Sequence, residues 1–82
     1  MRVEVRLFAT LVRYLPKDAK AGSTHLDVAE GSSVGDVTDA LGIPADLSRV
    51  ILVNDQDTDE RRRLVEGDVV TLFPPLAGGA RG

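Results

Sequence analysis

The chain has 82 residues and a formal net charge of −3, so we expect one small domain with a single hydrophobic core. It contains no cysteine, which excludes disulfide bonds, thiolate metal sites and a thiol nucleophile. The acidic balance argues against general binding of nucleic acids, which depends on Lys and Arg contacts to phosphates. No apolar run approaches the roughly 20 residues that span a bilayer, and the first residues do not resemble a signal peptide. We therefore expect a cytoplasmic protein that binds neither membranes nor nucleic acids.

The first part of the chain predicts two strands. Val3, Val5 and Leu7 alternate with charged residues, and this period of two is typical of a strand with one buried face. A second alternating run covers residues 24–29, after a loop-forming stretch over residues 16–23 that is rich in turn residues. Together the two runs predict an N-terminal hairpin with a wide connection.

The pattern then changes to a period that is typical of a short helix. Positions i, i+3, i+4 and i+7 are occupied by Val34, Val37, Thr38 and Leu41. Ser33 is a suitable N-cap, with Asp36 completing a variant of the capping box. Gly42 suits the left-handed position after the last turn, and Pro44 prevents the helix from continuing. A helix this short needs a sheet to pack against.

The second half of the chain predicts further strands. Residues 50–53 form a continuous apolar run that ends at a turn over residues 54–55. We expect a brief edge strand within residues 61–65, followed by a tight turn at residues 66–68 and a last strand over residues 69–73. One helix among strands of a small sheet predicts an α+β fold in which the helix covers one face.

No catalytic site emerges from the side chains. The single histidine, His25, falls on the solvent face of its strand, with Asp27 as the nearest acidic residue on that face. General acid–base catalysis needs a positioned partner and a pocket, and the sequence implies neither. We therefore interpret His25 as a surface residue and expect no catalytic residues.

One acidic motif has the spacing of a calcium-binding loop. Positions 1, 3, 5 and 12 of such a loop are matched by Asp55, Asp57, Asp59 and Glu66. Glu60 stands where the loop requires glycine, and the three arginines at residues 61–63 oppose a divalent cation. We therefore interpret this segment as a charged hairpin whose acidic and basic ends partly neutralise one another, and expect no metal.

The C-terminal residues differ in composition from the rest. We expect a folded domain over residues 1–75 and a flexible tail over residues 76–82. Gly78 and Gly79 lack Cβ atoms, so the tail can enter a narrow channel that side chains would block. Four extended residues after Pro75 would reach about 13 Å. The alternative is an ordinary disordered terminus without function.

The sequence resembles the ubiquitin-like sulfur carriers, in particular the small subunit of molybdopterin synthase. The matching segments are residues 5–9, 33–37, 53–55, 66–70 and 73–79. The last segment, with its diproline and glycine pair, is the most specific, because the thiamine-pathway carrier generally lacks the diproline. At residues 53–55 the family often has Val-Asn-Gly, where this chain has Asp55.

The resemblance implies a β-grasp fold, with a mixed sheet of four to five strands and one main helix on one face. It also implies a carrier that binds no cofactor and contributes no catalytic side chain. A ubiquitin-activating-like adenylyltransferase would use ATP to adenylate the terminal glycine, and sulfur would displace AMP to give a thiocarboxylate. The tail would then enter the large subunit of molybdopterin synthase and donate sulfur to the pterin precursor.

The resemblance assigns roles to the residues at the end of the chain. The thiocarboxylate would form on Gly79, with Gly78 giving clearance beside it. The partner-binding segment would be Phe73, Pro74, Pro75, Leu76 and Ala77. Members of the family normally end at the glycine pair, whereas Ala80, Arg81 and Gly82 follow here.

For this departure we favour removal of the three extra residues by a processing peptidase. The alternatives are that the partner accepts the longer end, or that the carrier role has been lost. Two other functions also stay open: a ubiquitin-like modifier that is conjugated to lysines, and an inactive β-grasp binding module.

Overall fold

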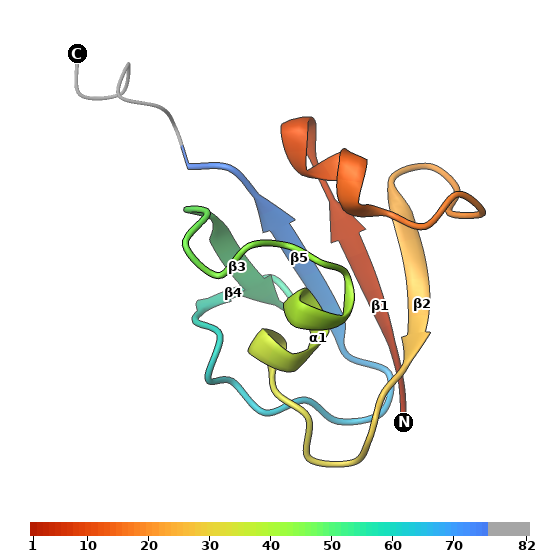
Figure 1. Cartoon of the computed structure of the whole chain (residues 1–82). Helices are drawn as coiled ribbons and strands as arrows, with labels where there is room; N and C mark the ends of the chain where they lie inside the picture. Colours follow the sequence, from red (N-terminus) through yellow and green to blue (C-terminus); the bar gives the residue numbers. More distant parts are fainter. Residues whose placement is uncertain (76–82) are drawn as a thin grey trace.

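The computed structural model describes residues 1–75, which form a five-stranded mixed sheet with a short helix on one face (Figure 1). The strand order is β2-β1-β5-β3-β4. The central pair, β1 and β5, is parallel, and the other neighbours are antiparallel. The elements in chain order are β1 (Arg2–Leu7), the 3-10 helix η1 (Ala9–Tyr14), β2 (Ser23–Asp27), α1 (Val34–Ala40), β3 (Val50–Val53), β4 (Gln56–Thr58) and β5 (Val69–Phe73). The predicted α+β architecture with one main helix is confirmed.

The core lies between the sheet and α1. Alternate residues of β1 are buried, as the period of two predicts, and β5 contributes Val70 and Leu72 to the same layer. The helix contributes Val34 and Val37, which are fully buried. Within residues 1–75, no helix is long and apolar enough to cross a membrane.

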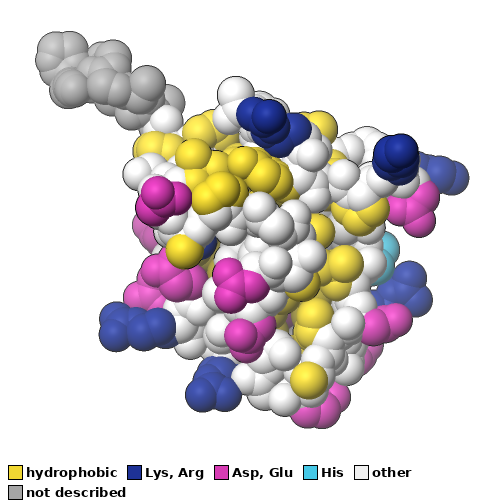
Figure 2. All heavy atoms as spheres, viewed as in Figure 1, with side chains coloured by type: hydrophobic (Ala, Val, Ile, Leu, Met, Phe, Trp, Pro, Cys, Tyr) yellow, Lys and Arg dark blue, Asp and Glu magenta, His cyan; other side chains and the backbone are white. Residues whose placement is uncertain are grey.

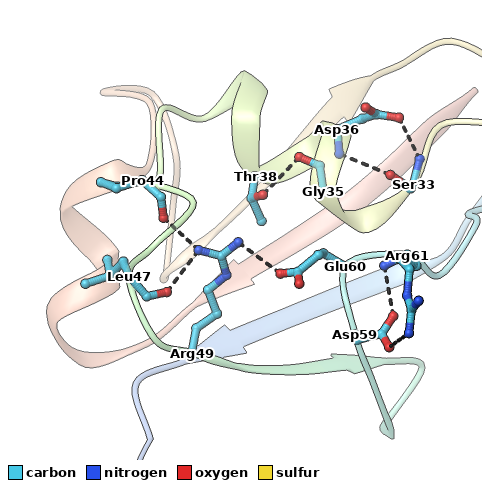
Figure 3. A network of polar contacts seen from close by, with 10 residues as sticks. All are labelled: Ser33, Gly35, Asp36, Thr38, Pro44, Leu47, Arg49, Asp59, Glu60 and Arg61. Carbon is cyan, nitrogen blue, oxygen red and sulfur yellow. Dashed lines mark hydrogen bonds and ion pairs between the residues drawn. The ribbon is translucent and has the colours of Figure 1, made fainter.

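The start of α1 is fixed by the predicted capping box (Figure 3). The Ser33 hydroxyl accepts a hydrogen bond from the Asp36 amide at 3.3 Å, and the Ser33 amide donates to the Asp36 carboxylate at 2.9 Å. After the helix, Gly42 adopts the predicted left-handed conformation, with φ of 80°. These two ends limit α1 to seven residues, so its stability depends on packing.

The predicted edge strand within residues 61–65 is wrong: the edge strand is β4, Gln56–Thr58. The two-residue turn at Asn54 and Asp55 reverses the chain at once, because both residues have positive φ, 52° and 69°. The residues after the turn therefore pair directly with β3, starting with Gln56 opposite Val53.

Residues 59–65 instead run along the N-terminal end of α1. The Glu60 carbonyl accepts a hydrogen bond from the Gly35 amide at 2.9 Å, and the Arg62 carbonyl accepts one from Val34 at 2.9 Å. Gly35 permits this approach, since a Cβ atom at that position would lie 3.3 Å from the Glu60 carbonyl oxygen. The segment thus connects β4 to β5 and holds α1 in place.

A buried carboxylate joins the β3–β4 turn to the start of β5. Asp68 is 5% exposed and accepts hydrogen bonds from the Asn54 side-chain amide and the Val65 backbone amide, both at 2.9 Å. The Asn54 side-chain oxygen accepts from the Val69 amide at 3.0 Å. These contacts satisfy the buried polar groups and fix β5 relative to β3.

The turn at Asn54 and Asp55 gives a direct test of the assigned β3–β4 hairpin. Replacing Asp55 with glycine should raise the free energy of unfolding by about 0.5–1 kcal/mol, because glycine has no Cβ penalty at positive φ. Urea denaturation would measure the change. As a control, Asp57→Gly within β4 should destabilise by a similar amount. A loss of stability in Asp55→Gly would contradict the assigned turn.

Candidate functional site

The candidate site is the end of the sheet at which β5 finishes. Phe73 is the last residue of β5, and Pro74 and Pro75 carry the chain away from the sheet (Figure 1). The remaining predicted site residues lie outside the described part of the chain: Leu76, Ala77, Gly78, Gly79, Ala80, Arg81 and Gly82. The roles assigned to those residues, and the division between residues 1–75 and 76–82, therefore stay predictions.

Sheet topology brings Phe8 to the same place. Because β1 is parallel to β5, their final residues are neighbours: Leu7 pairs with Leu72, and the Phe8 amide donates to the Leu72 carbonyl at 3.1 Å. The rings of Phe8 and Phe73 meet edge to face, with centroids 6.4 Å apart and an interplanar angle of 88°. This geometry is favourable for two aromatic rings and makes Phe73 part of a larger apolar surface.

Most of the exposed large apolar residues in the described chain gather at this end. Phe8 is 50% exposed, Val12 43% and Leu47 37%. Val12 lies on η1, which packs beside β1 and β5, and Leu47 precedes β3, whose first residue pairs with Phe73. Val65, at 64%, lies before the start of β5, at the opposite end. Apolar patches of this kind commonly mark interfaces.

Figure 2 shows hydrophobic side chains gathered near the base of the segment drawn in grey. Phe73 was predicted from the sequence as part of this surface, whereas Phe8, Val12 and Leu47 were not. One signal could have identified Phe8. It continues the alternation of Arg2, Glu4 and Arg6, so it places an aromatic ring on the otherwise charged face of β1.

A hollow of about 500 Å³ lies beside Phe8. Its wall includes Val12 and two alanines, Ala9 and Ala21, that adopt left-handed φ values of 53° and 54°. Arg6 lines the charged side, where its Nε lies 2.6 Å from a Glu4 carboxylate oxygen. That hydrogen bond and the Glu4 charge raise the pKa of Arg6 above its ordinary value. The surface thus combines an apolar wall with a fixed ion pair.

His25 lies on the exposed face, but its acidic neighbour differs from the prediction. Its Nε2 is 3.8 Å from a carboxylate oxygen of Glu4, not of Asp27, because Glu4 is its cross-strand partner. The His25 side chain is 51% exposed. A side chain this accessible has no enclosed environment in which to position a substrate.

The acidic residues of the calcium-like motif do not converge. A carboxylate oxygen of Glu66 accepts from the Arg2 backbone amide at 2.9 Å, while Asp59 faces Arg61, with 3.5 Å between charged atoms. Asp57 lies on β4. Among the described residues, no three acidic or histidine side chains form a group that could hold a metal ion.

A model of the family described as Mut7-C ubiquitin matches residues 1–78. The chain belongs to this ubiquitin-like family. An uncharacterized protein of Archaeoglobus fulgidus is 32% identical over 92 residues, covering 96% of this chain and 100% of that relative.

Two solved structures extend the comparison. Small archaeal modifier protein 1 of Haloferax volcanii is 27% identical with a TM-score of 0.71, covering 92% of this chain and 98% of its own. Subunit 1 and 2 of the molybdopterin-converting factor of Helicobacter pylori form a complex in which the matching chain is 26% identical, with a TM-score of 0.62 and coverage of 96% and 100%. The predicted β-grasp fold and the resemblance to ubiquitin-like sulfur carriers are confirmed.

The partial exposure of Phe8 predicts a mild effect on stability. Phe8→Ser should lower the free energy of unfolding by about 1 kcal/mol, because the ring is half exposed and loses mainly its contact with Phe73. Leu7→Ala, at a position 1% exposed, should cost about 3 kcal/mol. Chemical denaturation of both variants would test this difference. Equal losses would mean that Phe8 belongs to the core and not to a contact surface.

Proposed function

We propose that this protein is a sulfur carrier that bears a thiocarboxylate on Gly79 and donates sulfur in molybdopterin synthesis. The observation that carries the proposal is the apolar surface around Phe73, which stands where the diproline leads to the glycine pair. Similarity to subunit 1 of the molybdopterin-converting factor supports the same role. The protein acts in the cytoplasm and is a substrate of other enzymes.

The chemistry requires an activated carboxylate. The charge of a free carboxylate is delocalised, so the group is a poor electrophile. Adenylation with ATP releases pyrophosphate and makes AMP the leaving group; a sulfur nucleophile then attacks the carbonyl carbon and AMP departs. The carrier supplies the reacting glycine and no acid, base or metal. Its folded part contributes recognition.

The reach of the tail limits where the partners lie. Gly79 is four residues beyond Pro75, and an extended chain of that length spans about 13 Å. An enzyme that encloses Gly79 must therefore lie against this end of the sheet, where the half-exposed Phe8 packs against Phe73. We assign this contact to an adenylyltransferase of the ubiquitin-activating type and to the large synthase subunit. The subunit complex of Helicobacter pylori supports the second assignment.

Residues 80–82 require a processing step, for which we propose a peptidase that exposes Gly79. Arg81 is too bulky for a channel fitted to glycine. Two forms of the protein would test this step: the 82-residue chain and a chain ending at Gly79. Each is incubated with the adenylyltransferase of the same organism, ATP and a sulfur source, and its intact mass is measured.

We expect oxygen-to-sulfur exchange in the chain that ends at Gly79 and none in the 82-residue chain without the peptidase. In a matched control that ends at Gly79 and carries Gly78→Val, exchange should fall by at least about tenfold, because the side chain narrows the clearance in the channel. Absence of exchange in every form would reject the carrier function. Exchange at Gly82 would reject the processing step and retain the carrier.

A second function is favoured by a specific comparison. The similarity to small archaeal modifier protein 1 supports conjugation of the activated glycine to lysines of other proteins. Adenylation is shared with sulfur transfer, but the acyl group then moves to an amine. Digests of cell protein should contain lysines modified with the Gly79 remnant if conjugation occurs. Their absence under oxidative and sulfur stress would leave sulfur carriage as the function.

A further inference from the structure

The loop over residues 41–49, between α1 and β3, lies beside the end of β5 on the helix-covered side (Figure 1). Val50, which follows the loop, pairs with Phe73. The loop therefore approaches the point where the chain leaves the sheet. It does so from the helix-covered face, which is opposite to the charged face of β1. It contains Leu47, one of the exposed apolar residues at this end.

Arg49 fixes the shape of this loop (Figure 3). Its Nη1 donates to the carbonyl oxygens of Pro44 at 2.8 Å and Leu47 at 3.0 Å. The Arg49 side chain is 5% exposed, although a guanidinium group ordinarily stays in water. One nitrogen of the guanidinium thus binds two carbonyls of the same turn.

The other side of the Arg49 guanidinium faces Glu60. Arg49 Nη2 lies 3.4 Å from a Glu60 carboxylate oxygen. The Glu60 backbone is itself held by the Gly35 amide at the start of α1, at 2.9 Å. The loop, including the Leu47 backbone, is thus tied through Arg49 and Glu60 to the start of the helix.

Burying the charged Arg49 side chain costs desolvation free energy. A loop that only connects α1 to β3 would not need this cost. Leu47 is one of the three exposed apolar residues around the exit of β5 and comes from the helix-covered side, whereas Phe8 belongs to the charged face of β1. With Gly79 within about 13 Å of Pro75, an enzyme that encloses the glycine lies close to both sides. The loop is therefore within reach of that enzyme.

We propose that this loop is the second half of the surface that holds the adenylyltransferase, with Leu47 as the contact and Arg49 as its positioning residue. This inference rests on the proposed function, because it assigns the enzyme that activates the tail to this surface. Leu47 adds an apolar contact. Arg49 acts through Leu47 and touches no reacting group.

The test measures adenylation of the chain ending at Gly79 by ATP–pyrophosphate exchange at varied carrier concentration. Leu47→Ser should raise the KM for the carrier by about tenfold and leave kcat unchanged, as for a central apolar contact. Arg49→Ala should raise KM to a similar extent. Because Arg49 acts through Leu47, the double variant should resemble either single variant instead of combining their effects.

Two matched controls separate this role from general effects. Val65→Ser removes an exposed aliphatic side chain at the opposite end, and Arg61→Ala removes an arginine that is 90% exposed, in the segment that holds Glu60. Both should keep the KM of the unchanged protein. Circular dichroism melts identify the temperature at which every variant is folded, and the kinetic measurements are made below it.

The outcomes distinguish this inference from the function on which it rests. If Leu47→Ser has the KM of Val65→Ser, the loop is not a contact, and the inference is wrong while the carrier function stands. If the effects of Leu47→Ser and Arg49→Ala multiply in the double variant, Arg49 does not act through Leu47. If the unchanged protein supports no pyrophosphate exchange, the carrier function fails, and the assignment of this surface to the enzyme fails with it.

Discussion

The structure depends on the parallel pairing of β1 and β5 at the centre of the sheet. A parallel pair brings together the C-terminal ends of two strands. Here these ends, Leu7 and Leu72, are more than sixty residues apart in the sequence. The residues that follow this pair, Phe8 and Phe73, are then forced into the same region, and their rings meet. The sheet therefore determines both where the chain leaves the body and which side chains surround that point.

The supports around this pair are polar. Asp68 and Asn54 connect the start of β5 to the β3–β4 turn, while Arg49 and Glu60 connect the loop before β3 to α1. Within residues 1–75 every buried side-chain polar atom has a hydrogen-bond partner. A small core of mostly Val and Leu can in this way hold a defined surface without larger aromatic residues.

The proposed role requires a surface that other enzymes recognise and requires no catalytic side chain. The described residues fit that requirement. His25 is exposed, and its acidic neighbour Glu4 is paired with Arg6 on the same strand. What the fold provides is an apolar surface beside the base of a glycine-containing segment. In both functions proposed above, the folded part would serve recognition and would supply no reacting group.

Local patterns in the sequence were enough to determine β1, the limits of α1, its capping box and the final strand, because each depends on residues within one turn or one strand. The edge strand was misplaced to residues 61–65, since the sequence does not show that the Asn54–Asp55 turn reverses the chain immediately. The glycine pair and diproline pointed to this end of the sheet as the candidate site. Only the tertiary structure brought Phe8, Val12 and Leu47 to that end and placed Glu4 beside His25, because these neighbours come from strand pairing between segments distant in the sequence.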